Sequence, residues 1–202
     1  MTPPYRVVTE RLVLRCWEPR DAALLKEAVD ASIDHLLPWM PWAADEPQPL
    51  EAKVDLLRQF RGNFDLGADF VYGIFEPDES AVVGGTGLHT RLGPEVYEIG
   101  YWIHADRSGH GYAREATAAL TRVAFELTPK ERIDIRCDPA NERSRAIPRA
   151  LGYTEEATLR RRLHYPEPRD VVIYSLFRED YASSPAASAA VEAYDAAGTR
   201  VL

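Results

Sequence analysis

Apolar residues along this 202-residue chain recur with a period of two in several short runs, and that spacing predicts β-strands. Three of the runs follow one another through short turns in the middle of the chain, which predicts antiparallel neighbours. The runs that predict strands are residues 9–16, 70–75, 81–89, 96–103, 133–137, 155–163 and 171–177.

Apolar residues at helical spacing predict three longer helices, which start near Pro19, after Pro49 and at Ala113. The third lies between the strand that ends at Ile103 and the strand at 133–137. A strand, a helix and a strand in this order predict a parallel pair joined by a right-handed crossover. A short fourth helix ends at Gly152. The expected fold class is therefore α/β (α+β), with a mixed, mostly antiparallel sheet and flanking helices.

A glycine-rich turn, Arg107-Ser108-Gly109-His110-Gly111-Tyr112-Ala113, joins the strand ending at Ile103 to the long helix. Such a turn leaves backbone N–H groups without partners at the positive end of a helix dipole, which suits a phosphate group. A plain connection remains an alternative. The turn is not a P-loop, because Gly-x-x-x-x-Gly-Lys-Ser/Thr is absent from the sequence. It is not a Rossmann fingerprint, because the third glycine position holds Arg114.

An unusual aromatic segment, His35-Leu36-Leu37-Pro38-Trp39-Met40-Pro41-Trp42, follows the first helix. Two prolines break any helix here. The segment is either a hydrophobic plug over the core or the aromatic wall of a substrate pocket.

The composition narrows the class of protein. With 46% hydrophobic and 28% charged residues, residues 1–181 are expected to form one globular domain. A formal net charge of −8 argues against nucleic-acid binding through a broad basic face.

The sequence has no apolar run of about 18 residues and no signal-peptide pattern at its start, so we expect a cytoplasmic protein without a membrane partner. Cys16 and Cys137 are read as reduced core residues. Residues 182–202, rich in alanine and serine, are expected to form a disordered tail or a frayed helix.

Four pieces of sequence resemble the GCN5-related N-acetyltransferases (GNAT), and within them the RimJ/RimL-like branch that acetylates ribosomal proteins. The resemblance covers residues 5–181, and all four pieces occur in the family's order. The pieces are Thr9-Glu10-Arg11-Leu12, Glu98-Ile99-Gly100-Tyr101-Trp102, Gly111-Tyr112-Ala113-Arg114-Glu115-Ala116, and Asn141-Glu142-Arg143-Ser144-Arg145-Ala146-Ile147-Pro148 followed by Leu151-Gly152-Tyr153.

The resemblance implies acetyl-CoA as the co-substrate and a splayed central parallel pair of strands. The family's Gln/Arg-x-x-Gly-x-Gly/Ala loop falls on Ser108-x-x-Gly111-x-Ala113, where Ser108 departs from the usual first residue. The pantetheine arm would lie between the strands that end at Ile103 and Cys137. The residues expected to bind the cofactor are Trp102, Ile103, Ser108, Gly109, His110, Gly111, Tyr112, Ala113, Asn141 and Ser144. Those expected to bind the substrate are His35, Trp39, Trp42 and Tyr101.

The same resemblance assigns chemistry to Glu98 and Ser144. Amide formation needs a base for the ammonium and a proton for the leaving thiolate. Glu98 matches the family's base position, although a structural carboxylate is the alternative. Ser144 matches the residue that hydrogen-bonds the CoA sulfur as general acid, and Asn141 matches a cofactor-binding Asn. Both would also serve as helix caps. In some relatives a tyrosine acts as the general acid, at the position that Pro148 occupies here.

Other titratable residues receive weaker assignments. His89 is a second candidate base or a surface histidine, and His110 is a candidate phosphate contact. Cys137 lies beside the expected thioester site, but no histidine is placed to activate it. No group of residues has metal-ligand spacing, so no metal is expected.

The expected activity is direct acetyl transfer from acetyl-CoA to a primary amine in a ternary complex, and the amine belongs either to a protein N-terminus or to a small molecule. The protein is a candidate homodimer. One alternative is an enzyme that uses succinyl-CoA. The carboxylate of that acyl group would be bound by Arg160, Arg161 and Arg162, unless these arginines form a solvated strand face. Another is a catalytically inactive acyl-CoA-binding sensor module.

Overall fold

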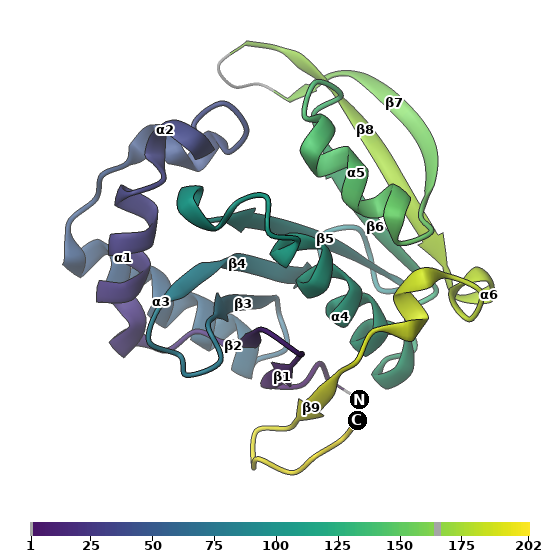
Figure 1. Ribbon diagram of the computed structural model, residues 1–202, viewed down its shortest axis with the longest axis horizontal. Helices are drawn as coiled ribbons and strands as arrows, with labels where there is room; N and C mark the ends of the chain where they lie inside the picture. The colour runs from purple at the N-terminus through teal and green to yellow at the C-terminus, as the bar shows by residue number, and fades with distance from the viewer. Residues whose placement is uncertain (1, 164–166) are drawn as a thin grey trace.

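A mixed β-sheet runs through the whole protein in the computed structural model, which describes residues 2–163 and 167–202 (Figure 1). The strands lie in the order β7-β8-β6-β5-β4-β3-β2-β1-β9. Among these strands β5 and β6 pair parallel and the other neighbours pair antiparallel, which confirms the expected sheet. The strands are β1 (Arg6–Val8), β2 (Val13–Cys16), β3 (Phe70–Phe75), β4 (Val82–His89), β5 (Val96–Ile103), β6 (Arg132–Cys137), β7 (Thr154–Leu163), β8 (Arg169–Phe177) and β9 (Glu192–Tyr194).

Helices flank the sheet, and two of them follow the long periodic segments of the sequence. α3 begins directly after Pro49, and α4 begins one residue before the expected Ala113. The α-helices are α1 (Ala22–Asp30), α2 (Ile33–Leu36), α3 (Leu50–Asp65), α4 (Tyr112–Leu127), α5 (Glu142–Ala150) and α6 (Arg178–Tyr181). Short 3₁₀ helices are η1 (Pro19–Asp21), η2 (Pro41–Asp45), η3 (Ala105–Arg107) and η4 (Pro185–Ser188).

The core has two parts. In the larger part, apolar residues of α4 such as Leu120 and Val123 pack against Ile99, Ile133 and Ile135 of the central strands. The smaller part joins α1 and α3 to the strands on the N-terminal side, through residues such as Trp17 and Phe75. The sheet is thus buried on both sides, which holds its strand ends in fixed places.

The parallel pair separates partway along its length. β5 and β6 pair from Val96 opposite Arg132 to Ile99 opposite Ile135. β5 then continues to Ile103, paired with β4 alone among the described strands. Residues 100–103 therefore present one open backbone edge, as the expected splay requires.

α5 continues through Pro148. The helix begins at Glu142, where the Asn141 side chain accepts a hydrogen bond from the Ser144 amide at 3.1 Å. Proline has no N–H, so Pro148 cannot donate to the carbonyl four residues earlier, which is that of Ser144. The hydroxyl of Tyr101 donates to this carbonyl instead, at 3.1 Å.

The expectation of a disordered tail or frayed helix at residues 182–202 was wrong. η4 and β9 are formed there, and β9 pairs antiparallel with β1, with Ala193 opposite Val7. The reason is that backbone hydrogen bonds and small side chains hold this segment. Ala186 and Ala193 are fully buried, and such small residues let the chain approach the sheet closely.

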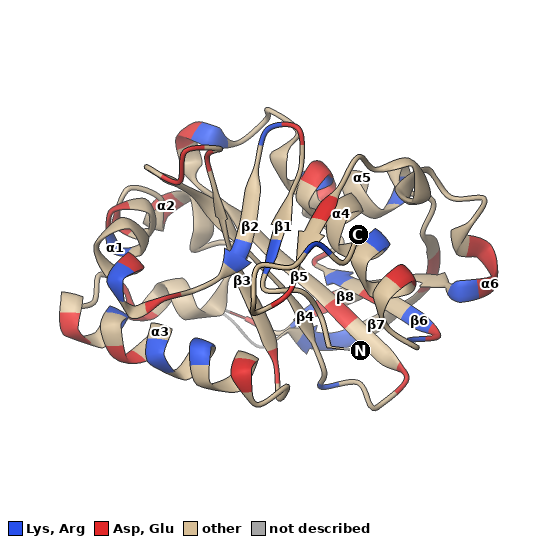
Figure 2. Ribbon diagram, turned by 90° about the horizontal axis from the view of Figure 1, so that it is seen from below, with Lys and Arg blue, Asp and Glu red and all other residues tan. Residues whose placement is uncertain are grey.

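Charged residues of both signs are interspersed over the molecule, for example along α3 (Figure 2). Local ion pairs therefore set the electrostatics of each site. Within residues 2–163 and 167–202, no helix has the length and apolar character needed to cross a membrane.

Candidate active site

The glycine-rich turn presents unpartnered backbone amides at the start of α4. Gly109 and Gly111 have φ angles of +85° and +82°, a left-handed conformation that glycine adopts without strain. Gly111 is the N-cap of α4, and its carbonyl accepts the amide hydrogen of Glu115 at 3.0 Å. No described residue accepts a hydrogen bond from the amides of Gly109, His110 or Gly111. The first amides of α4 also lack intrahelical acceptors, so the turn fits an anion.

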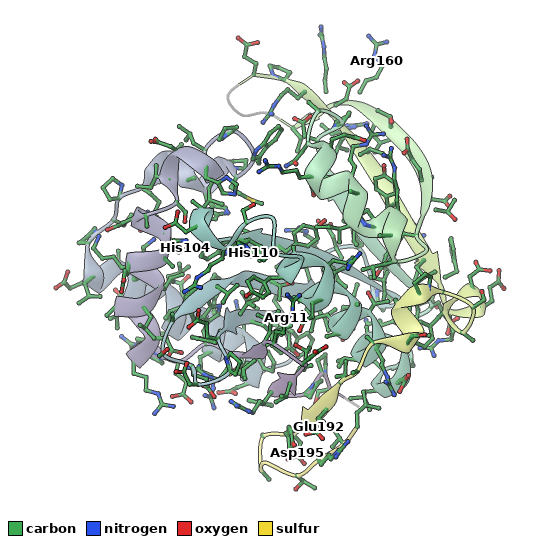
Figure 3. The ribbon with its side chains drawn as sticks, viewed as in Figure 1. Arg11, His104, His110, Arg160, Glu192 and Asp195 are labelled. Atoms are coloured by element: carbon green, nitrogen blue, oxygen red, sulfur yellow. The ribbon has the colours of Figure 1, made fainter. Side chains whose placement is uncertain are left out.

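A clamp made of Thr9, Arg11 and Glu115 holds this turn in place. The Glu115 carboxylate accepts hydrogen bonds from the Thr9 hydroxyl at 2.6 Å and from the Arg11 backbone amide and Nε at 3.0 and 2.7 Å. Arg11 also donates from Nη1 to the His110 carbonyl at 3.1 Å, and the two residues lie near each other in Figure 3. The clamp gives two of the four sequence pieces a shared physical role.

Two adjoining cavities meet at the splay of β5 and β6. One, of about 730 Å³, contains the glycine-rich turn and the start of α5. The other, of about 700 Å³, lies between the aromatic segment, the central strands and the end of β7. Both cavities are lined in part by the same residues, which are Trp39, Met40, Tyr101, Trp102, Asn141 and Ser144.

Three groups capable of hydrogen bonding meet at this junction. The Tyr101 and Ser144 hydroxyl oxygens lie 3.2 Å apart, and either can donate to the other. Burial raises the pKa of Tyr101 above its usual value and that of the Cys137 thiol to about 11. Both groups therefore stay protonated near neutral pH. Tyr101, Ser144 and Cys137 together place two hydroxyl groups and a thiol at the open edge of β5.

Part of the aromatic segment forms a wall of the second cavity. Trp39 and Trp42 line it, and the Trp42 ring meets that of Trp102 edge-on, with 6.0 Å between ring centroids. His35 lies elsewhere, because it lines the cavity that contains the glycine-rich turn. The structure therefore separates His35 from Trp42, whereas Trp39 lines both cavities.

Glu98 lies in the second cavity but is held by two arginines. It is 6% exposed. Arg91 forms a bidentate ion pair with it, with 3.1 Å between Arg91 Nε and Glu98 Oε2. Arg136 Nε lies 3.7 Å from the same oxygen. Both carboxylate oxygens thus already face guanidinium groups.

His89 lines the same cavity and is paired with Asp69, a residue that the sequence did not point to. His89 Nδ1 lies 2.9 Å from Asp69 Oδ2 and 3.2 Å from Oδ1. Asp69 is in the loop between α3 and β3, twenty residues away in the sequence, so only the fold reveals the pair. A buried ion pair between Lys53 and Glu46, also in this lining, was missed for the same reason.

Most of the expected cofactor residues line the first cavity. They are Trp102, Ile103, Ser108, Gly109, Gly111, Tyr112, Ala113, Asn141 and Ser144. The His110 side chain is exposed and stacks on the Tyr112 ring, with 5.8 Å between centroids, and it is not among the lining residues. Arg160, Arg161 and Arg162 are exposed on β7 and line neither cavity, and Arg160 projects away from the molecule in Figure 3. The succinyl-CoA alternative thus gains no support.

The described part of the chain contains no group of three or more His, Cys, Asp or Glu residues arranged to hold a metal ion.

Comparison with known proteins identifies the kind of enzyme to which this site corresponds. The family described as "Acetyltransferase (GNAT) domain" matches residues 11–154. A putative ribosomal N-acetyltransferase of Bacillus subtilis, YdaF, is 28% identical over 182 residues, 86% of this chain and 95% of that protein. The [ribosomal protein uS5]-alanine N-acetyltransferase of Escherichia coli is 29% identical over 160 residues, 76% of this chain and 80% of that protein.

Among solved structures, Mycobacterium smegmatis RimJ in complex with CoA-disulfide is similar with a TM-score of 0.78 and 27% identity. The match covers 92% of this chain and 94% of that one.

Proposed function

Given that this chain belongs to the acetyltransferase (GNAT) family and is an acyltransferase that uses acetyl-CoA, we propose that it acetylates the primary amine at a protein N-terminus. The transfer is direct, from acetyl-CoA to the amine in a ternary complex. The observation that carries the proposal is the meeting of three features: the unpartnered amides of the turn, the open edge of β5, and the cavity beyond it.

The acceptor is proposed from the shape of the second cavity and from the names of the relatives. Its lining extends from Trp39 and Trp42 to Leu163 on β7, which suits a cleft that takes the end of a polypeptide. The E. coli relative is named for acetylating the alanine of a ribosomal protein, and the B. subtilis relative is also named as a ribosomal N-acetyltransferase. The same names support a cytoplasmic location, and the expected homodimer stays a prediction.

The residues divide the work as follows. The amides of Gly109, Gly111 and Ala113 hold the diphosphate of acetyl-CoA, which supplies the activated acetyl group as a thioester. The open edge of β5 at residues 100–103 pairs with the pantetheine amides. The Ser144 hydroxyl, which lies beside the Tyr101 hydroxyl, donates a hydrogen bond toward the leaving sulfur.

Trp39 and Trp42 exclude water from the acetyl group and position the amine. Glu98 and His89 are the two candidates on this cavity wall that can accept the ammonium proton. Asn141 keeps its role as the cap of α5, and the cap places Ser144 at the junction.

A peptide-array assay tests the proposal. Peptides that represent N-termini beginning with alanine, serine, threonine or methionine, and a matched panel of small amines, are incubated with the protein and acetyl-CoA. Acetylated products are identified by mass spectrometry, and free CoA is measured in parallel. We expect acetylation of the peptides at their N-terminal amine. CoA binding without any acetylated product would contradict the proposal and favour the inactive binding module, and acetylation of small amines alone would contradict the assignment of the acceptor.

A further inference from the structure

The pair formed by His89 and Asp69 has the geometry of a catalytic base with its orienting carboxylate. An ionised carboxylate only accepts hydrogen bonds, so His89 must donate to Asp69 from Nδ1, at 2.9 Å. In the neutral imidazole, Nε2 then carries the free lone pair. No described residue forms a hydrogen bond with Nε2. The pair therefore leaves an unprotonated ring nitrogen ready to accept a proton.

Two glycines provide the space that this ring occupies. A methyl group built on Gly87 would lie 3.0 Å from Nε2, and one built on Gly100 would lie 3.4 Å from it. The ring therefore lies over backbone that has no side chains, on the face where Gly100 lines the cavity. Gly100 is also the first residue of β5 beyond the last pairing with β6, where the open edge begins. Nε2 thus lies at the wall of the cavity close to the splay.

Glu98 is less well placed for the same task. Its oxygens already accept hydrogen bonds from Arg91, and Arg136 lies beyond. Guanidinium groups do not give up their protons near neutral pH, so an incoming ammonium would have to displace or share these contacts. His89 has its partner on the other ring nitrogen and keeps Nε2 free. The histidine and its carboxylate are 20% and 29% exposed, so the cavity remains open to them.

On the basis of the proposed function, we propose that His89 is the catalytic base of the transfer and that Asp69 is its positioning residue. The ammonium of the acceptor gives one proton to His89 Nε2 and becomes a neutral amine. The amine nitrogen bonds to the thioester carbonyl carbon, the carbon–sulfur bond breaks, and the second proton passes from nitrogen to the departing sulfur. The products are an amide and CoA thiol, and the proton on His89 returns to solvent.

The charged groups around His89 bear on its pH dependence. Asp69 faces Nδ1, and Glu98 lies opposite His89 in the register of β4 and β5. Arg91 follows His89 by two residues and Arg136 approaches from β6, and both contact Glu98. The negative charge of Asp69 contacts the ring directly, whereas the charge of Glu98 is paired with the arginines.

The test is the dependence of kcat on pH, between pH 5.5 and 9.5, with acetyl-CoA and a peptide that the wild-type protein acetylates. For the wild type we expect a low-pH limb on which the rate falls as imidazole takes up a proton. His89→Gln should lower kcat by about 10²–10⁴-fold at pH 7 and abolish that limb, with CoA affinity unchanged. Asp69→Asn should lower kcat while the Kd for CoA stays unchanged, because an amide no longer fixes Nδ1 as the donor and Nε2 as the acceptor.

The controls separate this inference from the proposed function and from misfolding. His104→Gln is the matched histidine control, because His104 Nδ1 accepts a hydrogen bond from a backbone amide and His104 lines neither cavity. It should retain the wild-type limb. If His89→Gln keeps the limb while the wild type acetylates the peptide, the base assignment is overturned and the proposed function stands. If His89→Gln does not fold, an unchanged kcat in Asp69→Asn overturns the assignment, and a wild type that acetylates no peptide overturns both proposals.

Discussion

Substitution of Gly111 by alanine isolates the contribution of the left-handed backbone to CoA binding. Gly111 has a φ of +82°, and a methyl group there would meet only Arg11 Nη2, at 3.6 Å, which is ordinary contact. The variant therefore introduces backbone strain without a steric clash. An L-residue in this conformation costs roughly 1–2 kcal/mol.

The strain has two measurable consequences. If the turn keeps its shape, the folded state loses roughly 1–2 kcal/mol, and Tm falls by about 2–4 °C per kcal/mol for a chain of this size. If the turn relaxes, the amides no longer converge on one point, and CoA must restore the shape when it binds. The Kd for CoA then rises by about 5–30-fold, which is the same energy expressed as an equilibrium constant. We expect the second effect, because no described residue accepts the Gly109, His110 and Gly111 amides in the free turn.

Gly198→Ala is the matched control. Gly198 has a φ of +77°, with open space around it, and it lies in the turn after β9. This variant should lose stability without a change in CoA affinity. The assay is isothermal titration with CoA, together with thermal unfolding of both variants. A Gly111→Ala protein with the wild-type Kd for CoA would show that the left-handed backbone at Gly111 does not contribute to CoA binding.

Four other changes have expected outcomes. Ser144→Ala should lower kcat with little change in the Kd for CoA measured by titration, because its hydroxyl lies beside Tyr101 and acts on the sulfur rather than the phosphates. Glu115→Ala should raise the Kd for CoA by about tenfold in the same titration, because it removes charge-assisted hydrogen bonds that hold the turn. Burial raises the pKa of the Cys137 thiol to about 11, so at pH 8 this thiol should react with iodoacetamide about 100-fold more slowly than a free thiol. Its reaction rate, followed by mass spectrometry, should rise about tenfold per pH unit up to pH 10. A rate that does not change with pH would contradict this. Burial raises the pKa of the Glu79 carboxyl, but hydrogen bonds from two arginines outweigh this effect, so the pKa is lowered overall. In urea unfolding, Glu79→Gln should therefore be less stable than the wild type above about pH 5. The difference in stability should shrink as the pH falls through the pKa of Glu79 in the folded protein.

Much of the architecture follows from local patterns in the sequence. Alternating and helical spacing identify the central strands and the two long helices, and the order of strand, helix and strand implies the parallel pair of β5 and β6. Glycines between a strand and a helix also identify the turn at residues 108–113. These features depend on neighbouring residues, which a sequence displays directly.

The rest depends on contacts between distant segments. β9 has few large apolar residues and is held by pairing with β1, so its pattern resembled that of a disordered tail. Asp69 reaches His89 only once β3 and β4 are paired in register, and Arg91 covers Glu98 only once β4 and β5 are paired. Pro148 lies inside α5, where the distant Tyr101 hydroxyl compensates for the hydrogen bond that the proline removes.

An NMR titration shows whether the glycine-rich turn and the open edge of β5 both bind CoA. Amide resonances of the ¹⁵N-labelled protein are followed as CoA is added, and pantetheine, which lacks the diphosphate, is the comparison ligand. We expect CoA to shift the resonances of residues 109–113 and of residues 100–103, and pantetheine to shift only those of residues 100–103. Saturation with CoA that leaves the amides of residues 109–113 unshifted would contradict this expectation.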